Sequence, residues 1–296
     1  METIKNKLMA VVLGGLALGM TLSSCQKKFD PNTYKPSVPL PSFAGYTASK
    51  DIETNALVAY WGFNGDLKEQ VSGITGTATG TSFGTGLTGQ ALQGAANSYV
   101  TSAVPPNIKN LHSFTASFWV KMPQNTTGAV GLVSIANSQS FWGSFDVFFD
   151  NGATATTGVL KVHCFNVSSN GTGTDGWLGG YTVSNPWNNW VNIIVAYDDV
   201  KGAFNVYYQG ASVGTANPGG FSPLNWTGAQ NMAFGALQFE TTPSLTTVVN
   251  NIPTSPQYYG GWASYLTGNL TQVSFYNVVL SKDEIGALYN LQKLGR

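Results

Sequence analysis

The segment from Ser113 to Lys121 constrains the fold more than any other, because its apolar side chains recur at every second residue. Phe114, Ala116, Phe118 and Val120 fall on one side, and mostly polar residues fall between them. Strand side chains alternate between the two faces of a sheet, whereas helical faces repeat every 3.6 residues. The pattern therefore predicts a β-strand with one face in a hydrophobic core.

Further strand patterns are spread over the chain, separated by turn-forming residues. They cover Leu57–Phe63, Ser144–Asp150, Val159–Val167, Trp190–Tyr197, Phe204–Gln209 and Leu270–Tyr276. The segment from Trp190 and the one from Phe204 are predicted to form a hairpin closed by Asp198 to Gly202. Ser281 to Glu284 fits a capping box, and Ile285, Leu288 and Tyr289 then share one face of a short helix.

Composition agrees with an all-β chain. Charged residues make up 9% of the sequence, while aromatic residues reach 12% and Gly numbers 35. Low charge combined with many Gly, Thr, Ser and Asn is typical of short strands joined by polar turns. The length after the N-terminal leader suits one large sandwich better than two small domains.

The N-terminus predicts export. A short basic stretch with Lys5 and Lys7 precedes an apolar run from Leu8 to Leu22. This run is shorter than a spanning helix needs, and its flanks are those of a secretory signal. The Leu-Ser-Ser-Cys ending resembles a lipobox, which implies cleavage after residue 24 and acylation of Cys25. An ordinary cleaved signal that happens to contain Cys is the alternative.

The segment 25–54 is predicted to be a tether. Pro31, Pro36, Pro39 and Pro41 recur in it without apolar periodicity, which favours a semi-rigid polyproline II spacer. The folded domain is then expected to cover 55–296. Cys164 remains without a cysteine partner, and its place beside Leu160 and Val162 in a strand indicates a small buried residue.

Two long segments are interpreted as functional loops because they contain aromatic residues among polar ones. The first runs from Asn166 to Asn189 and the second from Gln238 to Thr267. Loops beyond about 12–15 residues in a compact domain are usually functional or disordered. The aromatic residues favour ordered, functional loops.

Several motifs, taken in order, resemble the laminin-G-like branch of the concanavalin A-like lectin/glucanase superfamily. They are Leu57–Phe63, Gly89–Leu92, Ser113–Lys121, Trp187–Tyr197, Val206–Gly210, Gly268–Asn277 and Leu280–Ile285. The resemblance covers about residues 55–291 and implies a jelly-roll sandwich of two antiparallel sheets with a short C-terminal helix. The family often has Asp where this chain has Gln209 and Thr271, which places ligand or metal contacts at those two positions in doubt.

The sequence argues against glycoside hydrolysis. Two carboxylates about 5–9.5 Å apart are needed, and the superfamily's glucanases carry them as Glu-x-Asp-x-x-Glu, which is absent here. Asp146 and Asp150 share a strand face, but four residues separate them by roughly 13 Å. A hydrolase is therefore the third of the hypotheses considered, and no catalytic residue is predicted.

Other chemistries are also constrained. His112 and His163 are the only histidines, and neither a Gly-x-Ser-x-Gly elbow nor paired cysteines accompany them, which argues against a serine triad or a structural zinc site. The near-neutral charge argues against nucleic-acid binding. Calcium is possible at turn aspartates, although these residues also form turns without metal. The aspartates in or beside turns are Asp66, Asp150, Asp175, Asp198 and Asp199.

Aromatic residues remain as the binding chemistry. Sugar C–H faces stack on indole and phenol rings, and sugar hydroxyls bond to short polar groups. Trp61, Trp119 and Trp190 lie in predicted strands and are expected in the core. Two interpretations are open for the tryptophans in loop-like segments: their rings bind a ligand, or they only cover the edge of the sandwich. These residues are Trp142, Trp177, Trp226 and Trp262. The predicted ligand-binding residues are Trp142, Trp177, Tyr181, Tyr259 and Trp262.

Asp146, Phe148, Lys161 and His163 are predicted to share an outward strand face, with a merely solvated surface as the preferred interpretation.

Together these features predict a lipid-anchored protein of the outer membrane or cell surface. Its jelly roll is expected to bind a glycan or extracellular polymer, without catalysis. Such proteins resemble the glycan-capture and adhesion lipoproteins of Bacteroidota-type outer membranes. The main alternative is a structural or adhesion module that contacts a protein partner.

Overall fold

The computed structural model describes residues 40–168, 171–248 and 262–296. Cys25 and Tyr259 lie outside the described residues. None of the helices within these ranges combines the length and apolar character that crossing a membrane requires. Residues from Pro41 to Arg296 form one compact unit.

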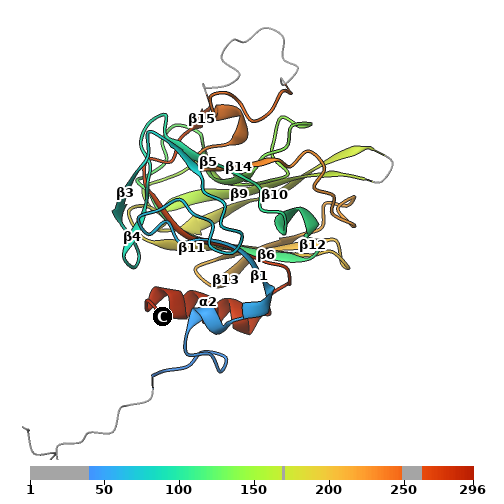
Figure 1. Ribbon diagram of the computed structural model, residues 1–296. Coiled ribbons are helices and arrows are strands. Elements are labelled where there is room, and N and C mark those ends of the chain that lie inside the picture. The colour runs from blue at the N-terminus through green and yellow to red at the C-terminus, as the bar shows by residue number, and fades with distance from the viewer. Residues whose placement is uncertain (1–39, 169–170, 249–261) are drawn as a thin grey trace, which may run out of the picture. The chain divides into compact units, whose positions relative to one another are not determined.

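Two β-sheets face each other in this unit (Figure 1). The helix-side sheet has the order β13-β12-β11-β6-β16-β4-β3, and β1 also pairs with β16. Its strands are β1 (Leu57–Trp61), β3 (Ser82–Thr85), β4 (Gln90–Gln93), β6 (Phe114–Lys121), β11 (Val191–Asp198), β12 (Ala203–Tyr208), β13 (Ala211–Ala216) and β16 (Asn269–Tyr276).

The far sheet has the order β10-β9-β8-β7-β14-β5-β2, with β15 paired to β7. Its strands are β2 (Thr77–Thr79), β5 (Tyr99–Ala103), β7 (Ala129–Ile135), β8 (Phe145–Asp150), β9 (Thr157–Val167), β10 (Gly173–Ser184), β14 (Asn231–Phe234) and β15 (Ala263–Ser264). Only the β15–β7 pairing is parallel among the named strands of the described residues. The two-sheet antiparallel sandwich predicted from the sequence is confirmed.

The core lies between the sheets and follows the predicted alternation. Phe114, Phe118 and Val120 of β6 are buried in it, and the Phe114 ring meets Phe145 of β8 with centroids 5.6 Å apart. Because successive side chains point to opposite faces, Trp119 emerges on the other side of β6, beneath the C-terminal helix. There its indole Nε1 donates to Gln292 Oε1 at 2.8 Å.

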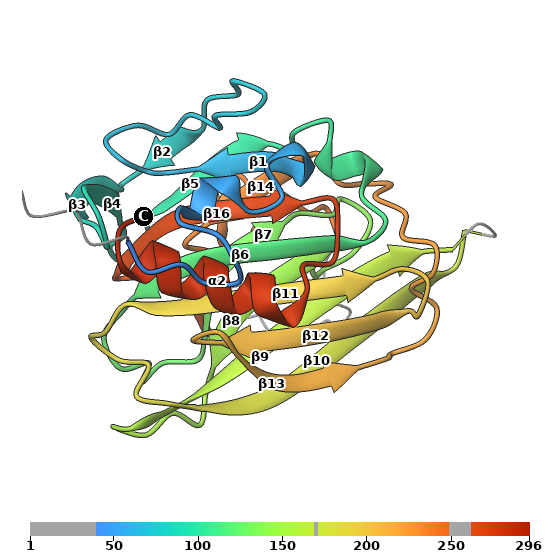
Figure 2. The same ribbon diagram turned by 90° about the horizontal axis from the view of Figure 1, so that it is seen from below.

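The C-terminal helix α2 (Lys282–Lys293) covers the outer face of the helix-side sheet (Figure 2). The predicted capping box is present: Glu284 N–H donates to Ser281 Oγ, and Ser281 N–H donates to Glu284 Oε2. Ile285 and Leu288 pack against Ile194 of β11. The helix therefore begins where its sequence signal lies.

The segment before β1 is part of the folded unit and is not tether throughout. It contains the 3-10 helices η1 (Ser49–Asp51) and η2 (Thr54–Ala56), and two more, η3 (Ile108–Asn110) and η4 (Gln238–Glu240), lie further along. Ile52 is buried in the cluster beneath α2. The compact unit begins at Pro41, N-terminal of residue 55, where the sequence analysis expected the folded domain to start.

The first predicted loop is largely a strand. Residues 173–184 form β10, which pairs with β9 along its whole length. The sequence did not predict this strand, because one of its faces is exposed and carries few apolar side chains. Its many Gly, Thr and Ser residues were interpreted as a loop. Trp190, predicted inside a strand core, lies just before β11 and is only partly buried.

Candidate functional site

A group of aromatic residues gathers on the outer face of the far sheet. Strand register places Asp146 beside His163, and His163 beside Trp177. The same register places Phe148 beside Lys161. The predicted shared outward face of β8 and β9 is therefore confirmed. The prediction of a solvated face is wrong for Asp146, Phe148 and His163, which are fully buried. The rings of Trp142 and Trp177 contact both Phe148 and His163.

Trp142, from the loop between β7 and β8, is the centre of this cluster. Its ring meets Trp177 edge-on, with centroids 4.9 Å apart and planes at 84°. It stacks on Phe148 at 5.4 Å and lies 5.6 Å from Trp262. Phe141 and Phe239 stack on each other at 4.4 Å behind these rings. We call these six rings the aromatic platform: Phe141, Trp142, Phe148, Trp177, Phe239 and Trp262.

Exposure differs sharply across the aromatic platform. Phe148 and Phe239 are buried, Trp142 and Trp262 are partly buried, and Trp177 is 48% exposed. The inner rings hold the outer ones in fixed orientations, because edge-to-face and offset contacts each favour particular geometries. An indole held rigidly and half exposed is suited to stacking on a flat apolar surface.

A pocket of about 410 Å³ lies beside Trp142 and Trp177. Its polar lining includes Gln139, Ser140 and Asp175. Gln139 is exposed, and the side chain of Asp175 is 55% exposed. The site therefore combines ring faces with an amide and a carboxylate, as recognition of a hydroxyl-rich ligand requires.

Asp175 is held by a buried histidine. His163 Nε2 lies 2.9 Å from Asp175 Oδ1, and His163 Nδ1 lies 3.3 Å from Asp146 Oδ2. Burial lowers the pKa of His163, but the Asp146 and Asp175 carboxylates outweigh it and leave this pKa above its ordinary 6.5. Asp146 also accepts from Ser134 Oγ at 2.5 Å and from Gly143 N at 2.7 Å.

The structure brings together three of the five predicted ligand residues, Trp142, Trp177 and Trp262. Tyr181 lies elsewhere. A bulge between Gly179 and Tyr181 inserts an extra residue, so that the ring turns towards the space between the sheets. There it packs against the main core, close to Gly214 of β13. The fifth residue, Tyr259, lies outside the described residues.

Other residues of this site were missed or were assigned differently from the sequence. Asp175 was considered only as a turn aspartate, and Trp177 as a loop residue, because β10 was not recognised. Phe141 and Phe239 gave no local signal, since their contacts join segments about 100 residues apart. Among the loop tryptophans, Trp226 fits the alternative to ligand binding, a ring that packs at the edge of the sandwich. It is buried, and its Nε1 donates to Leu111 O at 2.7 Å.

The aspartates considered for calcium are partnered in various ways. Asp150 pairs with Lys161 at 2.5 Å, Asp198 with Lys201 at 2.6 Å, and Asp199 with His112 at 3.4 Å. Within the described ranges, no three His, Cys, Asp or Glu side chains form a group able to hold a metal. Calcium therefore stays a prediction from the sequence.

A family model described as the concanavalin A-like lectin/glucanases superfamily, of the laminin G type, matches residues 93–286. A search of curated proteins gives no significant match.

Solved structures share the fold at low sequence identity. The binding domain of Paraclostridial Mosquitocidal Protein 1 has a TM-score of 0.56 and 15% identity, covering 80% of this chain and 52% of that one. The botulinum neurotoxin serotype G binding domain has a TM-score of 0.52 and 14% identity, covering 80% of this chain and 51% of that one. This chain thus spans about half the length of those toxin domains.

A third structure is matched over almost its whole length. Domain 4 of AbnA, a GH43 extracellular arabinanase from Geobacillus stearothermophilus, was solved in complex with arabinotriose. It has a TM-score of 0.51 and 17% identity, covering 79% of this chain and 98% of that one.

Proposed function

Because the chain belongs to the concanavalin A-like lectin/glucanases superfamily, we propose that it is a surface-anchored, non-catalytic domain that binds a glycan at the aromatic platform. The observation that carries this proposal is the half-exposed Trp177 ring, held edge-on by Trp142 beside a pocket lined by the half-exposed carboxylate of Asp175. The indole would stack on a sugar ring, and Asp175 would accept hydrogen bonds from its hydroxyls.

Rigidity supports this assignment. His163 fixes Asp175 from below, and the inner rings fix both tryptophans. A site that is ordered before its ligand arrives loses less conformational entropy on binding. The arabinanase domain with the same fold, which was solved with an arabinotriose ligand, is consistent with a saccharide as the ligand class.

The arrangement of the acids supports binding without catalysis. Asp146 is fully buried, and its two oxygens accept from Ser134 and Gly143. Asp150 is engaged by Lys161. The carboxylates of Asp146 and Asp150 are therefore engaged by neighbouring residues of the protein. Glycosidic cleavage instead needs two carboxyl groups that both reach the same glycosidic bond.

The anchor and the location are part of the proposal. The leader and the Leu-Ser-Ser-Cys sequence support acylation of Cys25 and attachment to the outer membrane or cell surface.

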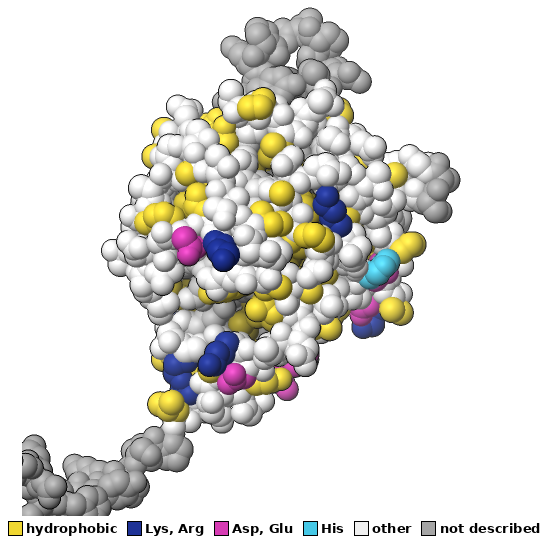
Figure 3. Space-filling view, viewed as in Figure 1, with side chains coloured by type: hydrophobic (Ala, Val, Ile, Leu, Met, Phe, Trp, Pro, Cys, Tyr) yellow, Lys and Arg dark blue, Asp and Glu magenta, His cyan; other side chains and the backbone are white. Residues whose placement is uncertain are grey.

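The face of the folded unit seen in Figure 3 carries few charged side chains. Its ligand would therefore be recognised mainly by stacking and hydrogen bonds rather than by long-range attraction.

A glycan array followed by calorimetry on the soluble chain 26–296 tests the proposal. We expect Trp177→Ala to weaken binding by roughly 1–3 kcal/mol, the scale of burying a large apolar side chain. The melting temperature should change little, because the ring is 48% exposed.

Trp190→Ala is the matched control, since Trp190 is another partly exposed tryptophan but does not line this pocket. Its glycan affinity should equal that of the wild type. Absence of any glycan ligand on the array, or unchanged affinity in Trp177→Ala, would refute the platform and favour an adhesion module that contacts protein.

A further inference from the structure

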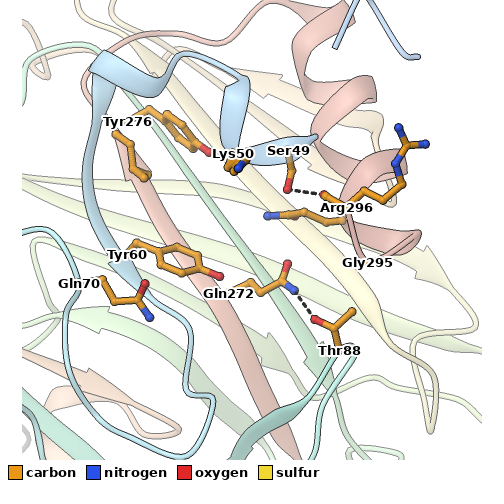
Figure 4. Close-up of a pocket in the computed structure, with 11 residues that line it drawn as sticks. Ser49, Lys50, Tyr60, Gln70, Thr88, Gln272, Tyr276, Gly295 and Arg296 are labelled. Atoms are coloured by element: carbon orange, nitrogen blue, oxygen red, sulfur yellow. Dashed lines mark hydrogen bonds between the residues drawn. The ribbon is translucent and has the colours of Figure 1, made fainter. Parts of the chain in front are cut away.

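A second pocket, of about 390 Å³, lies on the opposite side of the sandwich from the aromatic platform. It is bounded by the outer face of the helix-side sheet, the segment before β1 and the end of α2 (Figure 4). Its volume lies within the range of small-molecule sites. The proposed function makes no use of it.

Gln272, on the sheet side of this pocket, has an unusual backbone. Its φ is +53°, and it lies where the pairing of β16 with β6 shifts register between Thr271 and Ser274. A non-glycine residue with positive φ in a central strand is strained, and bulges often redirect a side chain at a functional position. Here the bulge directs the Gln272 amide into the pocket, where it donates to Thr88 Oγ1 at 3.3 Å.

Further polar groups converge on the same space. Figure 4 shows Tyr60 extending towards Gln272, with Gln70 beside its ring. Within the part of the chain that the structure describes, the Tyr60 hydroxyl, the Gln70 side-chain amide and the Lys50 ammonium form no hydrogen bond with protein, which leaves these groups available to a ligand. A phenol ring beside two amides and a hydroxyl offers one stacking surface and several donors and acceptors.

The charged side chains in the pocket lining are all cationic. Lys50 and Arg296 contribute to the lining, and no Asp or Glu does. The Arg296 guanidinium is directed away from Tyr60 and Gln272 (Figure 4), because it donates to Pro41 O at 2.9 Å and Thr47 O at 2.5 Å. Among the side chains of this lining, Lys50 is therefore the one that would attract a negative group on a ligand.

We propose that this pocket is a second saccharide site that takes an acidic sugar unit of the hexuronate type. Lys50 faces the sugar carboxylate, Tyr60 lies against the ring, and the Gln70 and Gln272 amides bind hydroxyls. The site is independent of the aromatic platform, so the chain would bind saccharides at two faces.

The test compares oligosaccharides of hexuronic acid with neutral hexose counterparts of the same linkage, by calorimetry on the soluble chain 26–296. We expect the neutral form to bind roughly fivefold more weakly at this site, the scale of a solvent-accessible ion pair. Lys50→Gln should remove that preference. Equal binding of both forms to the wild type would overturn the assignment of an acidic ligand.

Gln272→Gly removes the amide at a backbone conformation that glycine adopts freely, so the fold should be retained. We expect it to weaken hexuronate binding by roughly three- to tenfold, the effect of one hydrogen bond. Gln209→Gly is the matched control, because Gln209 also has a positive φ of 55° and does not line the pocket. Equal affinity in the Gln272 and Gln209 variants would overturn the site.

Two further measurements separate this proposal from the first. Trp177→Ala should leave hexuronate binding at the second pocket unchanged, and loss of that binding would show that only the aromatic platform binds sugar. Inorganic phosphate at millimolar concentration should not compete. Competition by phosphate alone would identify a simple anion site and overturn the saccharide assignment.

Discussion

Glu240 gives an unusual pH dependence of stability that can be worked out from the structure. It ends η4, directly after Phe239 of the aromatic platform, and only 5% of it is exposed. Burial raises the pKa of Glu240 from 4.5 to about 7, although a hydrogen bond from Leu237 N lowers it slightly. The carboxyl therefore keeps its proton in the folded chain at a pH where the unfolded chain has lost it.

The direction in which stability changes with pH follows from the number of protons that each state binds. Between about pH 4.5 and 7 the folded state binds more protons than the unfolded state, so the free energy of unfolding falls as pH rises. With about 1.4 kcal/mol for each tenfold change in a proton equilibrium, the loss reaches about 3 kcal/mol at pH 8. Glu240→Gln removes the ionisation, and its amide oxygen still accepts from Leu237 N.

Urea unfolding of wild type and Glu240→Gln at pH 4 and pH 8, followed by tryptophan fluorescence, measures the effect. We expect near-equal stability at pH 4 and a variant more stable by about 3 kcal/mol at pH 8. His163 also has a raised pKa, and the stability from its protonated form is lost as pH rises through that pKa. The difference between the two proteins cancels this contribution.

Glu69→Gln is the contrasting variant. Glu69 is fully buried, but its oxygens accept from Tyr60 N, Val71 N and both donors of Ser72. An amide nitrogen cannot accept, so this variant should be destabilised by about 1–3 kcal/mol.

A stability difference between wild type and Glu240→Gln that does not change with pH would refute the burial argument for Glu240.

Three other outcomes are expected. Cys25→Ser should leave the membrane fraction, because at ~0.8 kcal/mol per buried methylene the acyl chains supply the attachment; a processed variant that stays membrane-bound would contradict the lipid anchor. Trp119→Phe should lower the free energy of unfolding by about 1–3 kcal/mol, since Gln292 loses its buried donor, and calorimetric unfolding would measure this. Incubation with β-glucans, xylans and α-glucans should release no reducing ends, and cleavage abolished by Asp146→Asn would overturn the non-catalytic proposal.

Much of the fold could be predicted from local patterns. The alternation in Ser113 to Lys121 predicted β6 and its core face, and the capping box at Ser281 predicted the start of α2. Both signals are local, because strand period and helix capping depend on residues within a few positions of each other. The β11–β12 hairpin also follows from neighbouring residues.

The candidate site could be predicted only in part. The polar surroundings of Trp142, Trp177 and Trp262 indicated exposed rings, yet burial depends on what packs from elsewhere. Trp226 had similar surroundings and is buried, because the carbonyl of Leu111 accepts from its indole. Tyr181 was misplaced because one bulge residue reverses which face a strand side chain occupies.

The sequence by itself determined the sandwich, its strand alternation and the capped helix, since these depend on short-range periodicity and turn chemistry. Only the tertiary structure decided that His163 lies between Asp146 and Asp175, and that Gln272 and Lys50 line one pocket. The physical reason is that strand register and sheet packing bring together residues far apart in the chain, and no local pattern records which distant side chains will meet.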